Sequence, residues 1–178
     1  MSYSRKILDL AKNTVNQLTE NSNKMRELEA RKANYASEYY KSLVEELKRE
    51  RDEILWNGNH AAADLHEAQK IKVREEFTLN PEQIADDAKL LQYGFNFTVE
   101  DVDKLLDKYK GNRTMERLIT DYAQGRNIKP NRSIETESSK LAQAEKMHTY
   151  YKSVVARPEY ADTWFDDAYF SKISEGVD

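Results

Sequence analysis

The chain has 178 residues, 34% of them charged, with a mean hydropathy of −0.91 and a formal net charge of −4. It has no cysteine, which excludes disulfides, thiolate metal sites and cysteine nucleophiles. It also lacks any apolar run of about 18 residues and an apolar N-terminal segment of signal-peptide length, so we expect neither a membrane-spanning helix nor secretion by a signal peptide.

The first 78 residues are predicted to form a long helical hairpin or coiled coil. Residues 3–56 contain neither Gly nor Pro and are mostly good helix formers. Apolar residues spaced three and four apart predict a packing seam; they are Leu8, Ala11, Val15, Leu18 and Met25, then Ala36, Tyr40, Leu43, Leu47 and Ile54. We predict a break or kink at Thr19–Asn23 and a helix end at Gly58, after which a helix over residues 60–77 folds back.

Residues 79–126 are predicted to form a small unit of three short helices. Asn80-Pro81 is typical of a helix start and Gly94 of its end. Thr98 is predicted to open the second helix, and Gly111-Asn112 to separate it from the third.

The remainder is divided into a linker over residues 127–139 and two C-terminal helices within residues 140–178, the second over residues 158–173. No segment has the pattern of a β-strand. The predicted fold class is therefore all-α.

The aromatic C-terminal segment is the strongest candidate for partner binding. Seven of the 18 aromatic residues fall between positions 150 and 170, mixed with carboxylates. The candidate partner-binding residues are Tyr160, Trp164, Phe165, Tyr169 and Phe170. These rings either cover the chain's own core or anchor another protein, because Trp and Tyr dominate binding hot spots.

A second candidate surface is the basic segment 104–132, which carries 8 basic and 3 acidic residues between two acidic segments. Its candidate residues are Lys104, Lys108, Lys110, Arg113, Arg117 and Arg126. They are suited either to phosphates of a nucleic acid or to an acidic partner within or between chains.

No motif of an enzyme or cofactor site is found. The chain has no glycine-rich phosphate loop, no nucleophile elbow and no zinc-protease motif. Glu145-x-x-His148 matches half of a di-iron carboxylate site, but neither His60 nor His66 has the Glu three residues earlier that the other half needs. We therefore expect no catalytic residues, no cofactor and no metal site.

The segment Asp86–Asn127 resembles uncharacterised proteins from the head-assembly modules of tailed phages of Gram-positive bacteria. The resemblance is carried by Leu90-Leu91, Gly94, Asp103, Leu105, Gly111-Asn112, Thr114-Met115 and Asp121-Tyr122-Ala123. It implies a non-enzymatic protein of the bacterial host cytoplasm or the virion.

The leading hypothesis is a non-enzymatic helical interaction or assembly protein, such as a phage structural or virion-assembly factor, that associates with itself or with another virion or host protein. Two alternatives stay open: a phage-encoded inhibitor that binds a host protein through its acidic aromatic tail, and a nucleic-acid-binding protein that uses residues 104–132.

Overall fold

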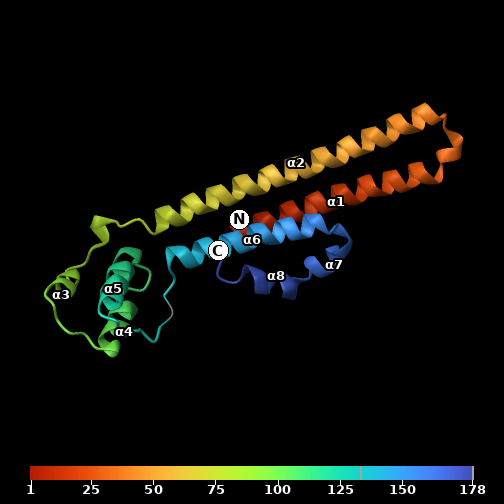
Figure 1. Ribbon diagram of the computed structural model, residues 1–178. Coiled ribbons are helices and arrows are strands. Elements are labelled where there is room, and N and C mark those ends of the chain that lie inside the picture. Colours follow the sequence, from red (N-terminus) through yellow and green to blue (C-terminus); the bar gives the residue numbers. More distant parts are fainter. Residues whose placement is uncertain (133, 178) are drawn as a thin grey trace. The chain divides into compact units, whose positions relative to one another are not determined.

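The computed structural model describes residues 1–132 and 134–177 (Figure 1). No β-strand occurs among them, which confirms the all-α fold class. The α-helices are α1 (Tyr3–Ala30), α2 (Ser37–Glu76), α3 (Ala88–Gln92), α4 (Val99–Lys108), α5 (Arg113–Gly125), α6 (Glu137–Ala156), α7 (Ala161–Trp164) and α8 (Asp167–Ser174); the 3₁₀ turns are η1 (Lys32–Asn34), η2 (Pro81–Gln83) and η3 (Pro158–Tyr160). Among the described helices, none combines the length and hydropathy that a membrane crossing requires.

The chain divides into two compact units. Unit 1 consists of Met1–Lys70 and Leu141–Asp178, and unit 2 of Ile71–Lys140. The C-terminal helices, which the sequence analysis placed in a segment of their own, thus belong to the same unit as the N-terminal hairpin.

The helical hairpin of unit 1 turns at residues 31–36, between α1 and α2 (Figure 1). The predicted break at Thr19–Asn23 is wrong, because α1 continues through this segment. Asn21 is buried there, and its side-chain amide donates to the Leu47 carbonyl (2.9 Å) and to Glu50 (3.1 Å) on α2. The polar residues that suggested a helix break thus include one that fastens the two helices together.

Gly58 lies inside α2, so the predicted helix end at this position is also wrong. A Cβ atom at position 58 would lie 2.3 Å from the Tyr151 hydroxyl and 2.9 Å from Thr14 Oγ1. Glycine in a helix interior costs about 1 kcal/mol relative to alanine. Here the missing side chain makes room for a hydroxyl of α6 and one of α1.

The core of unit 1 forms where α6 packs against both helices of the hairpin. Residues of α1 from Tyr3 to Leu18 share one buried cluster with Ala62 of α2 and with the α6 residues Met147, Tyr151 and Val154. Tyr151 is fully buried, and its hydroxyl lies 3.4 Å from Thr14 Oγ1. This polar contact inside the core satisfies both hydroxyl groups.

The C-terminal segment does not form the single helix predicted over residues 158–173. It is divided into η3, α7 and α8, with Phe165 and Asp166 between the last two helices. The Asp166 carboxylate accepts a hydrogen bond from the Tyr169 backbone N–H (3.0 Å) and so caps the start of α8.

Unit 2 largely follows the predicted capping residues. Thr98 and Asp101 form a capping box at the start of α4, and Asn112 caps α5. Gly94 and Gly111 adopt positive φ angles of 74° and 88° where the preceding helices end. The core consists of Val102, Leu106, Ile119 and Ala123, with Leu91, Phe97, Leu105, Tyr109, Ile128 and Ile134 packed around it.

Two predictions for unit 2 need correction. The helix expected to begin at Pro81 is only a 3₁₀ turn, which Thr114 holds against α5 by accepting from the Asn80 N–H (3.0 Å). The segment expected to be a linker contributes Ile128 and Ile134 to the core. Composition suggested a free connection, but two isoleucines fix the described part of this segment to unit 2.

Candidate functional site

Most of the C-terminal aromatic residues pack against the chain's own core. Trp164, Phe165 and Phe170 are partly buried against the main cluster of unit 1. Tyr150 of α6 donates its hydroxyl hydrogen to the Trp164 carbonyl (2.7 Å), and burial raises the pKa of Tyr150 to about 12. These three rings therefore cover the core.

The other two predicted anchor residues are more accessible. Tyr160 is 54% exposed and Tyr169 is 37% exposed. Tyr169 packs edge-on against Trp164, with 5.6 Å between ring centroids. Tyr160 is thus the member of the set whose ring is most available to a partner.

A cavity of about 410 Å³ lies beside Trp164. It is lined by Thr149, Lys152, Ser153, Ala156, Arg157 and Trp164. The indole Nε1 of Trp164 is buried and has no hydrogen-bond partner among the described residues.

Most of the predicted basic surface is engaged within unit 2. Lys108 pairs with Asp87 (2.6 Å), and this hydrogen bond lowers the pKa of Asp87. Arg117 donates to the Phe77 carbonyl (3.2 Å), and Arg126 to the Asn96 side chain (2.9 Å). Within residues 1–132 and 134–177, Lys104 and Lys110 form neither an ion pair nor a side-chain hydrogen bond.

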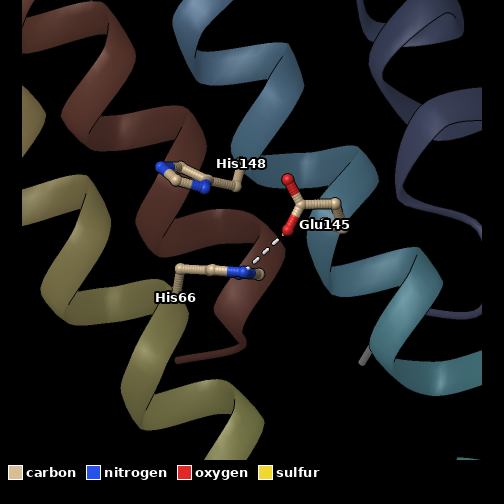
Figure 2. Close-up of side chains that lie close together, drawn as sticks. All are labelled: His66, Glu145 and His148. Atoms are coloured by element: carbon tan, nitrogen blue, oxygen red, sulfur yellow. Dashed lines mark ion pairs between the residues drawn. The ribbon is translucent and has the colours of Figure 1, made fainter. Parts of the chain in front are cut away.

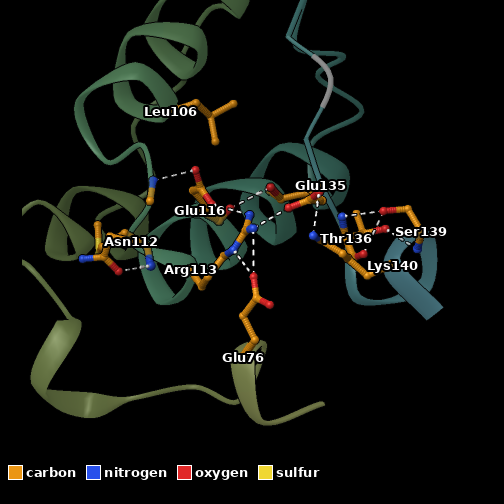
Figure 3. Close-up of polar contacts among 12 residues, drawn as sticks. Glu76, Leu106, Asn112, Arg113, Glu116, Glu135, Thr136, Ser139 and Lys140 are labelled. Atoms are coloured by element: carbon orange, nitrogen blue, oxygen red, sulfur yellow. Dashed lines mark hydrogen bonds and ion pairs between the residues drawn. The ribbon is translucent and has the colours of Figure 1, made fainter. Parts of the chain in front are cut away.

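Arg113 is at the centre of the largest polar network of unit 2 (Figure 3). Its guanidinium contacts Glu76 (2.9 Å), Glu116 (3.2 Å) and Glu135. Glu116 in turn accepts from the Gly111 N–H (3.1 Å). A cavity of about 530 Å³ adjoins these charges, and its lining combines three carboxylates with three basic side chains, those of Lys110, Arg113 and Arg132. The carboxylates oppose the binding of a phosphate there.

In the distal part of the hairpin, α1 and α2 pack mainly against each other. We call residues 19–53 the hairpin arm. Among the described residues, neither hydrophobic core includes a member of this arm. Its seam residues Met25, Leu43, Val44 and Leu47 are only half-buried, and Tyr39 is 57% exposed.

Polar contacts nevertheless hold the two helices of the arm together. Lys24 pairs with Glu50 (2.7 Å), and the Tyr40 hydroxyl donates to Glu29 near the turn. The Lys32 ammonium lies 5.1 Å from the centroid of the Tyr40 ring. The arm is therefore a defined two-helix element in which Leu28 is buried, most other apolar residues are half-buried and Tyr39 is exposed.

The structure also brings together three residues that the sequence analysis did not combine. His66 of α2 faces Glu145 and His148 of α6, and one ligand atom from each lies within 4.8 Å of the others (Figure 2). His66 Nε2 is 2.9 Å from the Glu145 carboxylate, and the two imidazole rings stack with centroids 4.6 Å apart.

The Glu145-x-x-His148 spacing was visible in the sequence, but its third member was not. No local pattern connects His66 with residues almost eighty positions later, because only the packing of α2 against α6 brings them together. By contrast, the His60 and Asp64 side chains on α2 are exposed, with 3.9 Å between His60 Nε2 and the Asp64 carboxylate. Together with Glu67 they would offer a cation only a weak site.

Comparison with known proteins yields no relative: no family model, no curated protein and no solved structure matches the chain. Function must therefore be argued from these sites themselves.

Proposed function

We propose that this chain is a non-enzymatic helical assembly protein that associates with a second copy of itself through the hairpin arm. The observation that carries the proposal is the contrast along the hairpin. Near Gly58, α6 covers α1 and α2 and forms a core, whereas the arm has no third helix and belongs to neither core cluster among the described residues.

A second arm would supply the missing layer. Two antiparallel hairpins packed face to face make a four-helix bundle, in which half-buried seam residues such as Leu43 and Leu47 become core. Fully burying an exposed apolar side chain contributes about 1.5–3 kcal/mol, and a half-buried one contributes correspondingly less. Tyr39 and the half-buried residues of each copy would together supply the apolar part of the interface.

The charges of the arm favour a second copy as the occupant. Residues 19–53 contain eight basic and nine acidic side chains interspersed along both helices. Such a surface is nearly neutral, so two copies do not repel each other and can form ion pairs across the interface. A strongly charged foreign partner would find no matching patch here.

The test is sedimentation equilibrium of the full chain and of two double variants. Tyr39→Glu with Leu43→Glu places charges on the apolar face of the arm. Leu90→Glu with Tyr93→Glu makes the same change at residues of unit 2 that are 38% and 72% exposed. We expect the unmodified chain and the unit 2 variant to dimerise, and the arm variant to dimerise at least tenfold more weakly.

Two results would contradict the proposal: an unmodified chain that stays monomeric at high concentration, or an arm variant that dimerises as tightly as the unit 2 variant. Circular dichroism of both variants establishes that their helix content is retained, so a loss of dimer can be assigned to the interface.

The setting we propose follows from the resemblance of residues 86–127 to phage head-module proteins: assembly of a virion in the bacterial host cytoplasm. The two alternatives receive less support. An inhibitor that binds through its tail would need accessible aromatic rings, but most of these rings cover the core. A nucleic-acid site would need accessible arginines, but Arg113 contacts carboxylates and Arg117 donates to a backbone carbonyl.

A further inference from the structure

We propose that His66, Glu145 and His148 form a binding site for a divalent transition-metal ion of the zinc class. The proposal is independent of self-association through the arm. Two imidazoles and one carboxylate are a common ligand set for zinc, with an open position left for water. Here they come from two helices, α2 and α6, and face one another (Figure 2).

The main support for this metal site comes from the polar contacts of the two ring nitrogens of His66. The Tyr3 hydroxyl donates to the Ala144 carbonyl (3.3 Å) and also lies 3.3 Å from His66 Nδ1. In the tautomer that keeps the bond to Ala144, Nδ1 carries the proton and donates to Tyr3. In the neutral ring, Nε2 then presents a lone pair.

That lone pair faces the Glu145 carboxylate at 2.9 Å. Two acceptor atoms at this distance repel each other unless a cation lies between them. In this tautomer a metal ion meets the need, whereas in the other tautomer Nε2–H donates to Glu145. A tetrahedral zinc ion with ligands at about 2.0–2.1 Å holds the ligand atoms about 3.3 Å apart, so Nε2 and the carboxylate would separate by a few tenths of an ångström on binding.

The contact of the other ring nitrogen of His66, Nδ1, also resembles that of metal-binding histidines. Their other ring nitrogen usually donates to a carbonyl, carboxylate or water, which fixes the tautomer and the orientation of the ring. For His66 this acceptor is the Tyr3 hydroxyl, and His66 is 6% exposed, so the ring is held in place. Tyr3 is therefore a positioning residue for the site.

The third ligand, His148, stacks its ring on that of His66, with 4.6 Å between the ring centroids. The ligand atoms of the three residues lie within 4.8 Å of one another, so binding of an ion would draw the His148 side chain closer to the other two.

A bound ion would fasten α2 to α6 inside unit 1. The Glu145 side chain is 61% exposed, so the ion would remain accessible to water and to exchange with the solvent. The expected consequence is a zinc-dependent increase in the thermal stability of unit 1.

The test is titration of the untagged full chain with zinc chloride at neutral pH, followed by calorimetry, with cobalt absorption as a second probe. The chain has only three histidines, so His60→Ala removes the one outside the site. We expect one ion per chain for the unmodified protein and for His60→Ala. Glu145→Gln and His148→Ala should weaken binding at least tenfold, and Tyr3→Phe by about tenfold through the second shell.

The melting temperature provides a separate readout. Zinc should raise it for the unmodified chain and for His60→Ala, but not for His148→Ala. The proposal is overturned if zinc does not bind, or if Glu145→Gln and His148→Ala bind it as tightly as His60→Ala. In that case the His66 ring donates a hydrogen bond from Nε2 to Glu145 instead of binding a metal. Glu145→Gln alters an exposed side chain, so it tests the site even if His148→Ala does not fold.

Discussion

At the scale of single residues, the packing of unit 1 depends on small groups that touch across helices. Gly58, Thr14 and Tyr151 meet at one point, where a missing side chain on α2 admits two hydroxyl groups. The sequence marks Gly58 only as a helix breaker. Its actual role depends on two residues from other helices, so no local pattern could reveal it.

We predict that Gly58→Ala destabilises the fold. The gain in helix propensity is about 1 kcal/mol, but the new methyl group overlaps the Tyr151 hydroxyl, and overpacking typically costs about 1–3 kcal/mol. Chemical denaturation measures the difference. Gly125→Ala is the matched control, because a Cβ there meets no atom within 4 Å and the change should be neutral or stabilising.

Adding Tyr151→Phe to Gly58→Ala removes the overlapping oxygen and should recover part of the lost stability. If Gly58→Ala is as stable as Gly125→Ala, the close contact at this position is not real.

Buried tyrosines are expected to make the protein sensitive to alkali. Burial raises the pKa of Tyr150 to about 12, above the value of about 10 in an unfolded chain. Between these values the unfolded chain loses its proton first, so the stabilisation is complete below pH 10 and is lost as the pH rises towards 12. Burial also raises the pKa of Tyr3 and Tyr151.

The measurement is circular dichroism with phenolate absorbance along an alkaline titration. Tyr150→Phe should lose less stability between pH 10 and 12 than the unmodified chain does. Tyr93→Phe, at a site that is 72% exposed, should behave like the unmodified chain. Equal alkaline sensitivity of both variants would refute the assignment to Tyr150.

At the scale of elements, the sequence predicted what local chemistry controls and failed where distant contacts decide. The cap at Thr98 and the turns at Gly94 and Gly111-Asn112 satisfy backbone groups nearby, and these were predicted correctly, although the capping of α5 by Asn112 was not foreseen. The continuity of α2 could not be predicted, because it depends on packing against α1 and α6. The same holds for His66, whose neighbours Glu145 and His148 lie on a helix far along the chain.

The break between α7 and α8 was missed, because residues 158–173 were predicted to form one helix, although Asp166 is of a residue type that favours N-caps. We predict that Asp166→Ala destabilises unit 1 by about 1 kcal/mol, the usual effect of removing an N-cap. Denaturation followed by tryptophan fluorescence can measure this, because Trp164 packs close to the cap. Asp162→Ala, which removes an acid from α7 without removing a cap, should change stability by clearly less.

At the scale of the whole molecule, the chain combines a packed three-helix region, a separate small helical unit and a hairpin arm without a covering layer. The all-α class and the long hairpin were predicted from composition and periodicity. The position of the hairpin turn was not, because residues 31–36 contain no Gly or Pro. The arm became a candidate interface only when the structure showed where α6 packs.

The most direct test of self-association through the arm uses the absence of cysteine in this chain. A single Ser42→Cys substitution, at an exposed position of the arm, accepts one spin label per molecule. Pulsed electron paramagnetic resonance then reports only distances between molecules. We predict a resolved intermolecular distance that disappears when Tyr39→Glu and Leu43→Glu are added; a featureless background decay from the labelled chain alone would contradict the account.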